Sequence, residues 1–331
     1  MTDKHKDVSL RNLEYLAMTD VVDRLYQQSQ NNKNLDDLMS LITSEPNIRL
    51  AYRNIKSNRG SLTCGVDKRT IKFIKRMELG KLVKLIQNKF NDYTPQDIRR
   101  IYIPKSNGKM RPLGIPTIID RLMQQCVLQI LEPIMEAKFH NNSNGFRPHK
   151  SCESAINQLK NYIYRNKCYY VVDVDIKGFF DNVDHGKLLK QLWTLGITDK
   201  HLLKIISLML KSNVLGEGIP TKGTPQGGIL SPLLANVVLN ELDWWLSNQW
   251  MTYKSKKEFK QYIRKNGYVC SNERKWLRKN TKLKEFYFVR YADDFKIICK
   301  SYEDAVKLKI ATIDWLQKRL NLEISEEKTK I

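Results

Sequence analysis

The sequence FYFVRYADDFKIIC spans residues 286–299 and gives the strongest indication of the fold. Two strongly apolar runs flank an adjacent pair of acids, Asp293 and Asp294, which predicts a β-hairpin whose turn carries both carboxylates. A solvated Asp-Asp turn is the ordinary alternative. Because Tyr291 and Phe295 flank the turn and both strands have buried character, we expect the two acids at the edge of a core.

A second acidic strand is predicted over residues 169–176, YYVVDVDI. Asp173 and Asp175 are spaced i, i+2 and therefore share one face of an otherwise apolar strand. Carboxylates on a buried strand are costly unless they are paired or bind a cation, and a structural role stays open for Asp173. If the hairpin at 286–299 lies beside this strand, three carboxylates converge. Oxygen-only ligation suits Mg²⁺ or Mn²⁺ and suggests two-metal phosphoryl or nucleotidyl transfer.

The charge balance indicates what the protein binds. The 331 residues include 57 Lys and Arg against 35 Asp and Glu, a formal net charge of +22. This excess favours nucleic acid or an anionic membrane surface as partner. The longest uncharged run, residues 223–240, contains prolines and glycines, so no spanning helix is predicted. The six cysteines show no C-x-x-C pair, and the N-terminus has no signal core, so a reducing compartment is expected.

Helices are predicted to dominate the first part of the chain. Residues 1–58 carry helical apolar spacing, and Ser44 followed by Pro46 is typical of a helix start. The pattern changes at residues 99–115, where two short strand patterns flank the turn KSNGK. A hairpin with a basic tip is predicted there. Helical patterns follow at about 117–131 and 151–165, and Ser151 is the expected N-cap of the second.

Strands and helices alternate in the second half. After the strand at 169–176, the pattern predicts helices at about 184–211 and 232–248, the hairpin at 286–299, a helix at 302–319 and a short strand near 322–324. This order is the outline of a ferredoxin-like split βαβ sheet. The predicted fold class is therefore α+β.

Residues 251–290 interrupt this order with 13 Lys and Arg against three Asp and Glu. Their weak periodicity predicts a surface insertion. Aromatic residues alternate with the charges, which suits contact with RNA phosphates and stacking on bases, while a solubilising loop is the alternative. The expected RNA-binding residues are Lys254, Lys256, Lys257, Arg264, Lys265, Arg274 and Lys275.

Four palm-type motifs make a family resemblance specific. YADD at residues 291–294 resembles the Y-x-D-D box of reverse transcriptases. DIKGFFDNVDH at 175–185 and TPQGGILSP at 224–232 resemble the first and second palm motifs of enzymes encoded by group II introns. EKTKI at 327–331 resembles the motif that closes the palm.

Three upstream segments extend the resemblance over essentially the whole chain. The paired runs IPK and RPLGIP within residues 103–116, and GFRP at 145–148, resemble fingers motifs of the same enzymes. The helical segment 1–75 resembles the N-terminal extension of this family, which retroviral enzymes lack.

The resemblance implies a fingers-palm fold and its division. Residues 1–75 would form the N-terminal helical extension, 76–167 the fingers with the basic hairpin, and 168–331 the palm with a basic insertion at about 250–285. Family members continue into a helical thumb and often into DNA-binding and endonuclease regions. The sequence given ends at Ile331, as expected for an N-terminal fingers-palm fragment that extends primers weakly and self-associates, for example as a homodimer.

The resemblance also implies catalytic roles for the carboxylates. Asp175, Asp293 and Asp294 would hold two Mg²⁺ ions, or Mn²⁺ in their place, with the carbonyl of Ile176 as a further ligand. The spacing alone does not choose Asp175 over Asp173, but the family motif does. Of the two turn residues, Asp294 would be the one that can act mainly through its charge.

Nucleotide contacts follow by the same resemblance. Phe180 stands five residues after Asp175, where a bulky gate would exclude a ribose 2′-hydroxyl, and Phe179 is the competing candidate. Lys328 or Lys330 would protonate the pyrophosphate, unless it is simply a solvated lysine. The nucleotide-binding candidates are Lys105, Arg111, Phe180, Gln226 and Gly227, of which the first two would grip the triphosphate.

The implied partners are an RNA template-primer, intron RNA and dNTPs, with no membrane, in a bacterial ribonucleoprotein of the cytoplasm or in an organellar matrix. Two alternatives stay open. One is an RNA-binding splicing maturase with little polymerase activity, and the other is a retron-type bacterial reverse transcriptase. The intact aspartate triad favours catalysis, while the N-terminal extension and the insertion argue against a retron.

Overall fold

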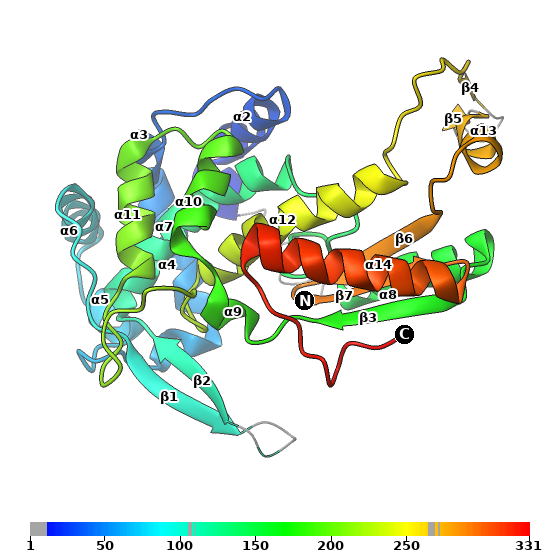
Figure 1. The fold of residues 1–331 in the computed structure, drawn as a ribbon. Coiled ribbons are helices and arrows are strands. Elements are labelled where there is room, and N and C mark those ends of the chain that lie inside the picture. The colour runs from blue at the N-terminus through cyan, green and yellow to red at the C-terminus, as the bar shows by residue number, and fades with distance from the viewer. Residues whose placement is uncertain (1–11, 105–107, 109, 264–268, 271) are drawn as a thin grey trace. The chain divides into compact units, whose positions relative to one another are not determined.

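The computed structural model describes residues 12–104, 108, 110–263, 269–270 and 272–331 (Figure 1). Packing divides the chain into two compact units. The first unit comprises Met1–Phe139 and Gly178–Val238, and the second unit comprises His140–Lys177 and Leu239–Ile331. Among the described helices, none is long and apolar enough to cross a membrane.

Helices make up most of the first unit, as predicted. They are α2 (Thr19–Gln30), α3 (Met39–Ile42), α4 (Glu45–Ser57), the 3₁₀ turn η1 (Arg59–Leu62), α5 (Ile71–Lys75), α6 (Leu79–Asn91), α7 (Ile118–Glu136), α9 (Phe179–Asn182), α10 (His185–Thr194) and α11 (Lys200–Leu210). Helix α7 forms the core, because α2, α3, α4 and α6 pack on it and most of its side chains are buried. It runs five residues past its predicted end at 131, through Pro133, because Ile134 and Met135 are buried.

A basic hairpin also belongs to the first unit. Strands β1 (Arg99–Pro104) and β2 (Met110–Ile115) pair antiparallel, with Arg99 opposite Ile115, which confirms the predicted hairpin. Lys105, a predicted triphosphate contact at its tip, lies outside the described residues.

The second unit is built on an antiparallel sheet of order β3-β7-β6. Its strands are β3 (Tyr170–Asp175), β6 (Phe286–Tyr291) and β7 (Asp294–Cys299). The predicted strand near 322–324 forms one bridge, Ile324 to Ile176, flanked by main-chain hydrogen bonds from Lys177 to Glu323 and from Ser325 to Asp175. After a turn at 326–328, a second bridge joins Lys330 to Asp173. The spatial order, C-terminal segment, β3, β7, β6, is that of a split βαβ sheet, and the predicted α+β fold is confirmed.

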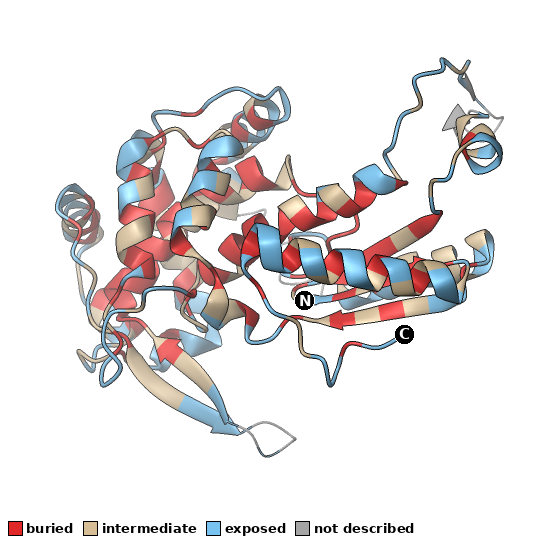
Figure 2. Ribbon diagram, viewed as in Figure 1, coloured by how far each residue is buried: buried red, intermediate tan, exposed pale blue. Residues whose placement is uncertain are grey.

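Helices cover both faces of this sheet. Helix α14 (Tyr302–Trp315), continued by the π-helical turn η2 (Leu316–Leu320), lies across one face, and α8 (Cys152–Asn166) lies on the other (Figure 1). Ser151 caps α8 by accepting a hydrogen bond from the Ser154 N–H, as its N-cap position predicts. The helix packs its apolar side chains on Val171, Val289 and Ile298. Strand β6 is buried along most of its length as a result (Figure 2).

Two further elements complete the chain. Helix α12 (Ser231–Gln249) contributes its last residues to the second unit. The basic insertion contains the strand pair β4 (Tyr262–Ile263) and β5 (Val269–Cys270) and the helix α13 (Glu273–Asn280), which its weak periodicity did not indicate.

Candidate active site

The catalytic candidates meet at one end of the sheet. Strand β7 pairs with β3 so that Asp294 lies directly opposite Asp175, and Asp293 occupies the turn just before Asp294. Opposite residues of an antiparallel pair have Cβ atoms about 4.5–5.5 Å apart and share one face. The hairpin therefore lies beside the acidic strand, which was the condition for the three carboxylates to converge.

The face of the sheet that carries these carboxylates is apolar at one end and charged at the other. Val171 and Ile298 are opposite each other and lie under α8, whereas Asp175 and Asp294 stand at the far end of the same ladder. Because side chains alternate along a strand, these positions share one face. We call the end with Asp173, Asp175, Asp294 and Lys296 the carboxylate face.

Like charges are crowded there. Burial, and then the negative charges of Asp293 and Asp175, raise the pKa of Asp294 above its ordinary value, although Lys296 acts in the opposite direction. Carboxylates opposite each other repel, and a bound cation would relieve this repulsion.

Two lysines already neutralise part of this charge. Lys296 Nζ lies 2.7 Å from Asp173 Oδ1, so the carboxylate of Asp173 is paired with a cation of the protein itself. Lys328 Nζ lies 3.1 Å from Asp175 Oδ2, yet its side chain is 64% exposed. An exposed lysine in such an ion pair is easily displaced, so the Asp175 carboxylate stays available to a divalent cation.

Oxygen donors of this kind fit a hard divalent cation such as Mg²⁺. Across the described part of the chain, no three His, Cys, Asp or Glu side chains are grouped closely enough to hold a metal ion as they stand. Two observations therefore support a divalent cation at this site. The negative charges of Asp175 and Asp294 lie close together, and the cationic Lys328 already lies beside Asp175. The side chain of Ile176 is buried, and its main chain is bridged to Ile324.

Three nucleotide candidates of the first unit, Phe180, Gln226 and Gly227, lie in or beside the loop that precedes α12. The Gly114 N–H of β2 donates to the Gln226 carbonyl at 2.6 Å, and the Thr224 N–H donates to the Phe180 carbonyl at 2.7 Å. Gly227 has φ +110°, and an added Cβ would lie 2.5 Å from the Gly114 carbonyl oxygen. Only glycine can come this close to the Gly114 carbonyl. Gly227 therefore allows the preceding residue, Gln226, to stay hydrogen-bonded to the hairpin through its carbonyl.

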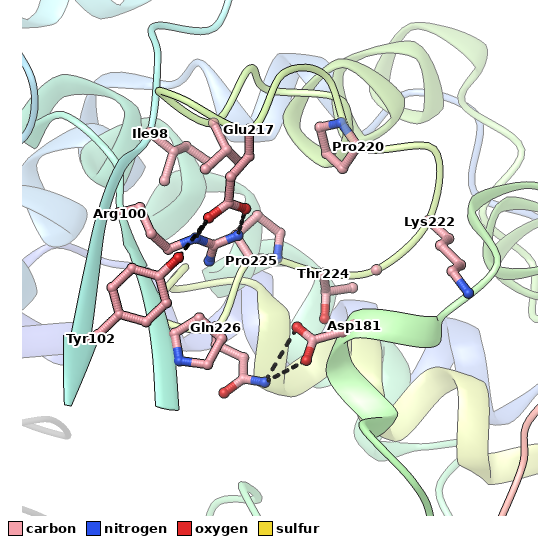
Figure 3. Close-up of a pocket in the computed structure, with 13 residues that line it drawn as sticks. Ile98, Arg100, Tyr102, Asp181, Glu217, Pro220, Lys222, Thr224, Pro225 and Gln226 are labelled. Carbon is pink, nitrogen blue, oxygen red and sulfur yellow. Dashed lines mark hydrogen bonds and ion pairs between the residues drawn. The ribbon is translucent and has the colours of Figure 1, made fainter. Parts of the chain in front are cut away.

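A cavity of about 410 Å³ opens beside this loop (Figure 3). Gln226 Nε2 points at the Asp181 carboxylate and lies 3.4 Å from both of its oxygens. Across the cavity, Arg100 donates to both oxygens of Glu217 at 2.7 and 2.6 Å, and this pairing lowers the pKa of Glu217. The Thr224 hydroxyl is buried and has no hydrogen-bond partner among the residues that the structure describes.

The two adjacent phenylalanines differ in exposure. Phe179 is 2% exposed, whereas Phe180 is only half-buried, with the two ring centroids 5.5 Å apart. Arg111 is exposed on β2, opposite Ile103.

The basic insertion presents part of its charge to solvent. Lys254, Lys256, Lys257 and Lys275 are exposed, while Arg264 and Lys265 lie outside the described residues. Lys257 Nζ lies 5.7 and 5.6 Å from the ring centroids of Phe259 and Trp276. Arg274 is half-buried and donates to the carbonyls of Trp250 and Met251 at 2.7 and 2.8 Å, so it anchors the insertion.

Comparison with known proteins gives concordant matches. Residues 103–331 match the reverse transcriptase (RNA-dependent DNA polymerase) family. The chain is 35% identical to the group II intron-encoded protein LtrA of Lactococcus lactis subsp. cremoris, over 94% of this chain and 57% of that protein. It is 33% identical to protein YkfC of Escherichia coli K12, over 89% of this chain and 78% of that protein. A putative COX1/OXI3 intron 1 protein of Saccharomyces cerevisiae is 29% identical over 94% of this chain and 39% of its own length. The chain thus spans little more than half of LtrA.

Proposed function

Because the chain belongs to the reverse transcriptase (RNA-dependent DNA polymerase) family, we propose that it is the RNA-directed DNA polymerase core of a group II intron-encoded protein. The observation that carries this proposal is the pairing of Asp175 with Asp294 at the end of a buried sheet, with Asp293 in the adjoining turn. The raised pKa of Asp294 supports it, because the charges of Asp293 and Asp175 contribute to that shift.

Asp175, Asp293 and Asp294 would hold two Mg²⁺ ions. When bound, such ions would supply Lewis acidity at the primer 3′-hydroxyl and compensate the charge of the triphosphate. The carboxylates themselves fix where that charge is placed, because two of them belong to paired strands of a packed sheet.

The first unit supplies contacts for the deoxynucleotide. Gln226 directs its Nε2 to Asp181, so its Oε1 is left to accept a hydrogen bond from the sugar. Phe180 would stand beneath the sugar and exclude a 2′-hydroxyl, a role that suits its half-buried ring better than the buried Phe179. Arg111 of β2 would contact the triphosphate, and Lys105, outside the described residues, stays a sequence-based candidate for the same contact.

Primer extension tests this proposal. The purified chain is incubated with an RNA template, an annealed DNA primer, Mg²⁺ and the four dNTPs. We expect primer extension that disappears when EDTA is added. Tight RNA binding without any extension, at every divalent ion and template tested, would instead support the maturase scaffold.

Lys328 provides a first prediction. Lys328→Ala is expected to lower the Mg²⁺ concentration that gives half-maximal incorporation by about two- to fivefold, because an exposed ion pair of this size competes with the cation at Asp175. The matched control is Lys330→Ala. The main chain of Lys330 makes hydrogen bonds to the main chain of Asp173, and the substitution keeps them. A lower rate at saturating Mg²⁺, with an unchanged requirement for it, would instead make Lys328 the proton donor to pyrophosphate.

A second function, RNA binding by the insertion, is favoured by the exposed lysines around Phe259 and Trp276. This surface would hold structured intron RNA through phosphate contacts and stacking.

Salt dependence tests that function. We expect the fourfold variant Lys254→Gln, Lys256→Gln, Lys257→Gln, Lys275→Gln to weaken RNA binding and to flatten the log–log salt slope by roughly 0.7 for each phosphate that is no longer neutralised. The control replaces four lysines that are exposed elsewhere, Lys190, Lys200, Lys204 and Lys211. Equal slopes for the two variants would make the insertion a merely solubilising segment.

A further inference from the structure

A fully buried ion pair lies on the other side of the sheet from the carboxylate face. Arg290 of β6 is 0% exposed and Asp243 of α12 is 1% exposed. Arg290 Nε donates to Asp243 Oδ1 at 2.8 Å, and Nη2 donates to Oδ2 at 2.6 Å. Desolvating two charges is costly even when the geometry is good. Stability alone is therefore a weak reason for a charged pair at this place.

The remaining arm of the guanidinium reaches the catalytic turn. Arg290 Nη1 donates to the Ala292 carbonyl oxygen at 2.7 Å. Ala292 has φ +57°, in the left-handed region that is unfavourable for alanine, and it directly precedes Asp293. Asp243 already fixes the planar guanidinium of Arg290. The hydrogen bond from Nη1 therefore holds the carbonyl of the strained Ala292 in a fixed position.

A second segment confines the turn. The Arg290 N–H donates to the Asn142 carbonyl at 2.9 Å, and the Asn144 N–H donates to the Arg290 carbonyl at 2.8 Å. This segment brings Gly145 so close that an added Cβ would lie 2.2 Å from the Ala292 nitrogen. The main chain of Ala292 is thus held between Gly145 and the carbonyl contact with Arg290.

We propose that Arg290, held by Asp243, is a positioning residue that keeps Ala292 left-handed and thereby aims the Asp293 carboxylate at its cation. This inference rests on the proposed function, because it takes Asp293 as a cation ligand. The alternative is that the pair only stabilises the fold.

The two roles predict different behaviour of a double variant. Arg290→Lys keeps the charge but loses the fork, so Ala292 is free to leave the left-handed region and Asp293 moves. Glycine adopts positive φ at no steric cost, so Ala292→Gly restores the turn without the guanidinium. If Arg290 only stabilised the fold, the folded Arg290→Lys variant would keep its cation affinity, and Ala292→Gly would raise stability without changing that affinity.

Terbium titration of the protein alone, detected by luminescence excited through tyrosine, measures cation affinity without nucleic acid or turnover. We expect Arg290→Lys to weaken terbium binding by at least about tenfold, as the loss of supporting partners usually does. Adding Ala292→Gly should recover most of this loss. The matched control is Arg278→Lys, which breaks an equally bidentate pair with Glu285, at 2.7 and 2.7 Å, away from the turn, and should leave the affinity unchanged.

Asp293→Asn, titrated in parallel, distinguishes a failure of the positioning role of Arg290 from a failure of the proposed cation site. Unchanged terbium affinity for Asp293→Asn overturns the carboxylate site and the positioning role together. A normal loss for Asp293→Asn with no loss for Arg290→Lys, or with no rescue by Ala292→Gly, overturns the positioning role alone. If Arg290→Lys does not fold, Gly145→Ala replaces it, because the added methyl displaces Ala292 and leaves the ion pair in place; wild-type affinity in that variant overturns the inference as well.

Discussion

Asp293→Asn and Asp175→Asn are each expected to reduce nucleotide incorporation by at least about 10³-fold. Each substitution removes one negative charge that balances a divalent cation. The charge of such a cation stabilises the transition state of nucleotide transfer by several kcal/mol. Single-turnover incorporation of one dNTP on an RNA template measures the loss. RNA binding should stay nearly unchanged, because these side chains lie at the end of the sheet and not on the basic insertion.

The fold should tolerate these variants, and stability should even rise. A carboxyl whose pKa is raised by folding destabilises the folded state above that pKa, and this penalty disappears as the pH falls through it. Burial and the charges of Asp293 and Asp175 raise the pKa of Asp294. We therefore expect Asp293→Asn to raise the melting temperature at pH 7, with a gain that shrinks as the pH falls.

Asp173→Asn is the matched control for both measurements. Asp173 is on the same strand as Asp175 but pairs with Lys296 at 2.7 Å. It should keep most of the activity. Equal losses in Asp173→Asn and Asp293→Asn would show that the effect comes from the charge of the strand in general and not from cation binding.

Phe180→Val is expected to relax sugar selection, with the discrimination between dNTP and rNTP falling by about 10- to 200-fold. The Phe180 ring is only half-buried, and the smaller side chain leaves room for a 2′-hydroxyl. Incorporation of dNTPs should change little. The ratio of kcat/KM values for the two nucleotides measures the effect.

The neighbouring phenylalanine serves as the control. Phe179 is buried, so Phe179→Ala should cost about 3–5 kcal/mol of unfolding free energy without changing sugar selection. If Phe179 substitution relaxes selection and Phe180 substitution does not, the gate is the preceding residue.

Local sequence patterns predicted most elements of the second unit. The alternation in 169–176 and the two apolar runs of 286–299 predicted β3, β6 and β7, and Ser151 predicted the start of α8. The register that sets Asp175 opposite Asp294 was not predictable, because it depends on pairing between strands more than a hundred residues apart.

Tertiary contacts explain the elements that the sequence did not indicate. Helix α13 contains few apolar residues, and it is held by Arg274 on the Trp250 and Met251 carbonyls and by the buried Leu277. The strand predicted near 322–324 is present as a single bridge, Ile324 to Ile176, with main-chain hydrogen bonds on either side of it.

The residues that support the site carried a weaker signal. Arg290 is a lone charge in an otherwise apolar strand, and Asp243 stands beside two tryptophans in a mostly apolar helix. Opposite charges of this kind are buried only when paired, which could have suggested the contact. Asp181 lies inside the first palm motif, but only the fold places it against Gln226.

Template-directed choice of the first nucleotide is the decisive measurement. Four RNA templates that differ in one base are annealed to the same DNA primer and offered each dNTP in turn, with Mg²⁺ and either the unaltered chain or Asp293→Asn. An RNA-directed DNA polymerase with its cations at Asp175, Asp293 and Asp294 should add only the complementary dNTP on each template, and the variant should add none. Addition that ignores the template base, or that survives Asp293→Asn, would contradict this assignment.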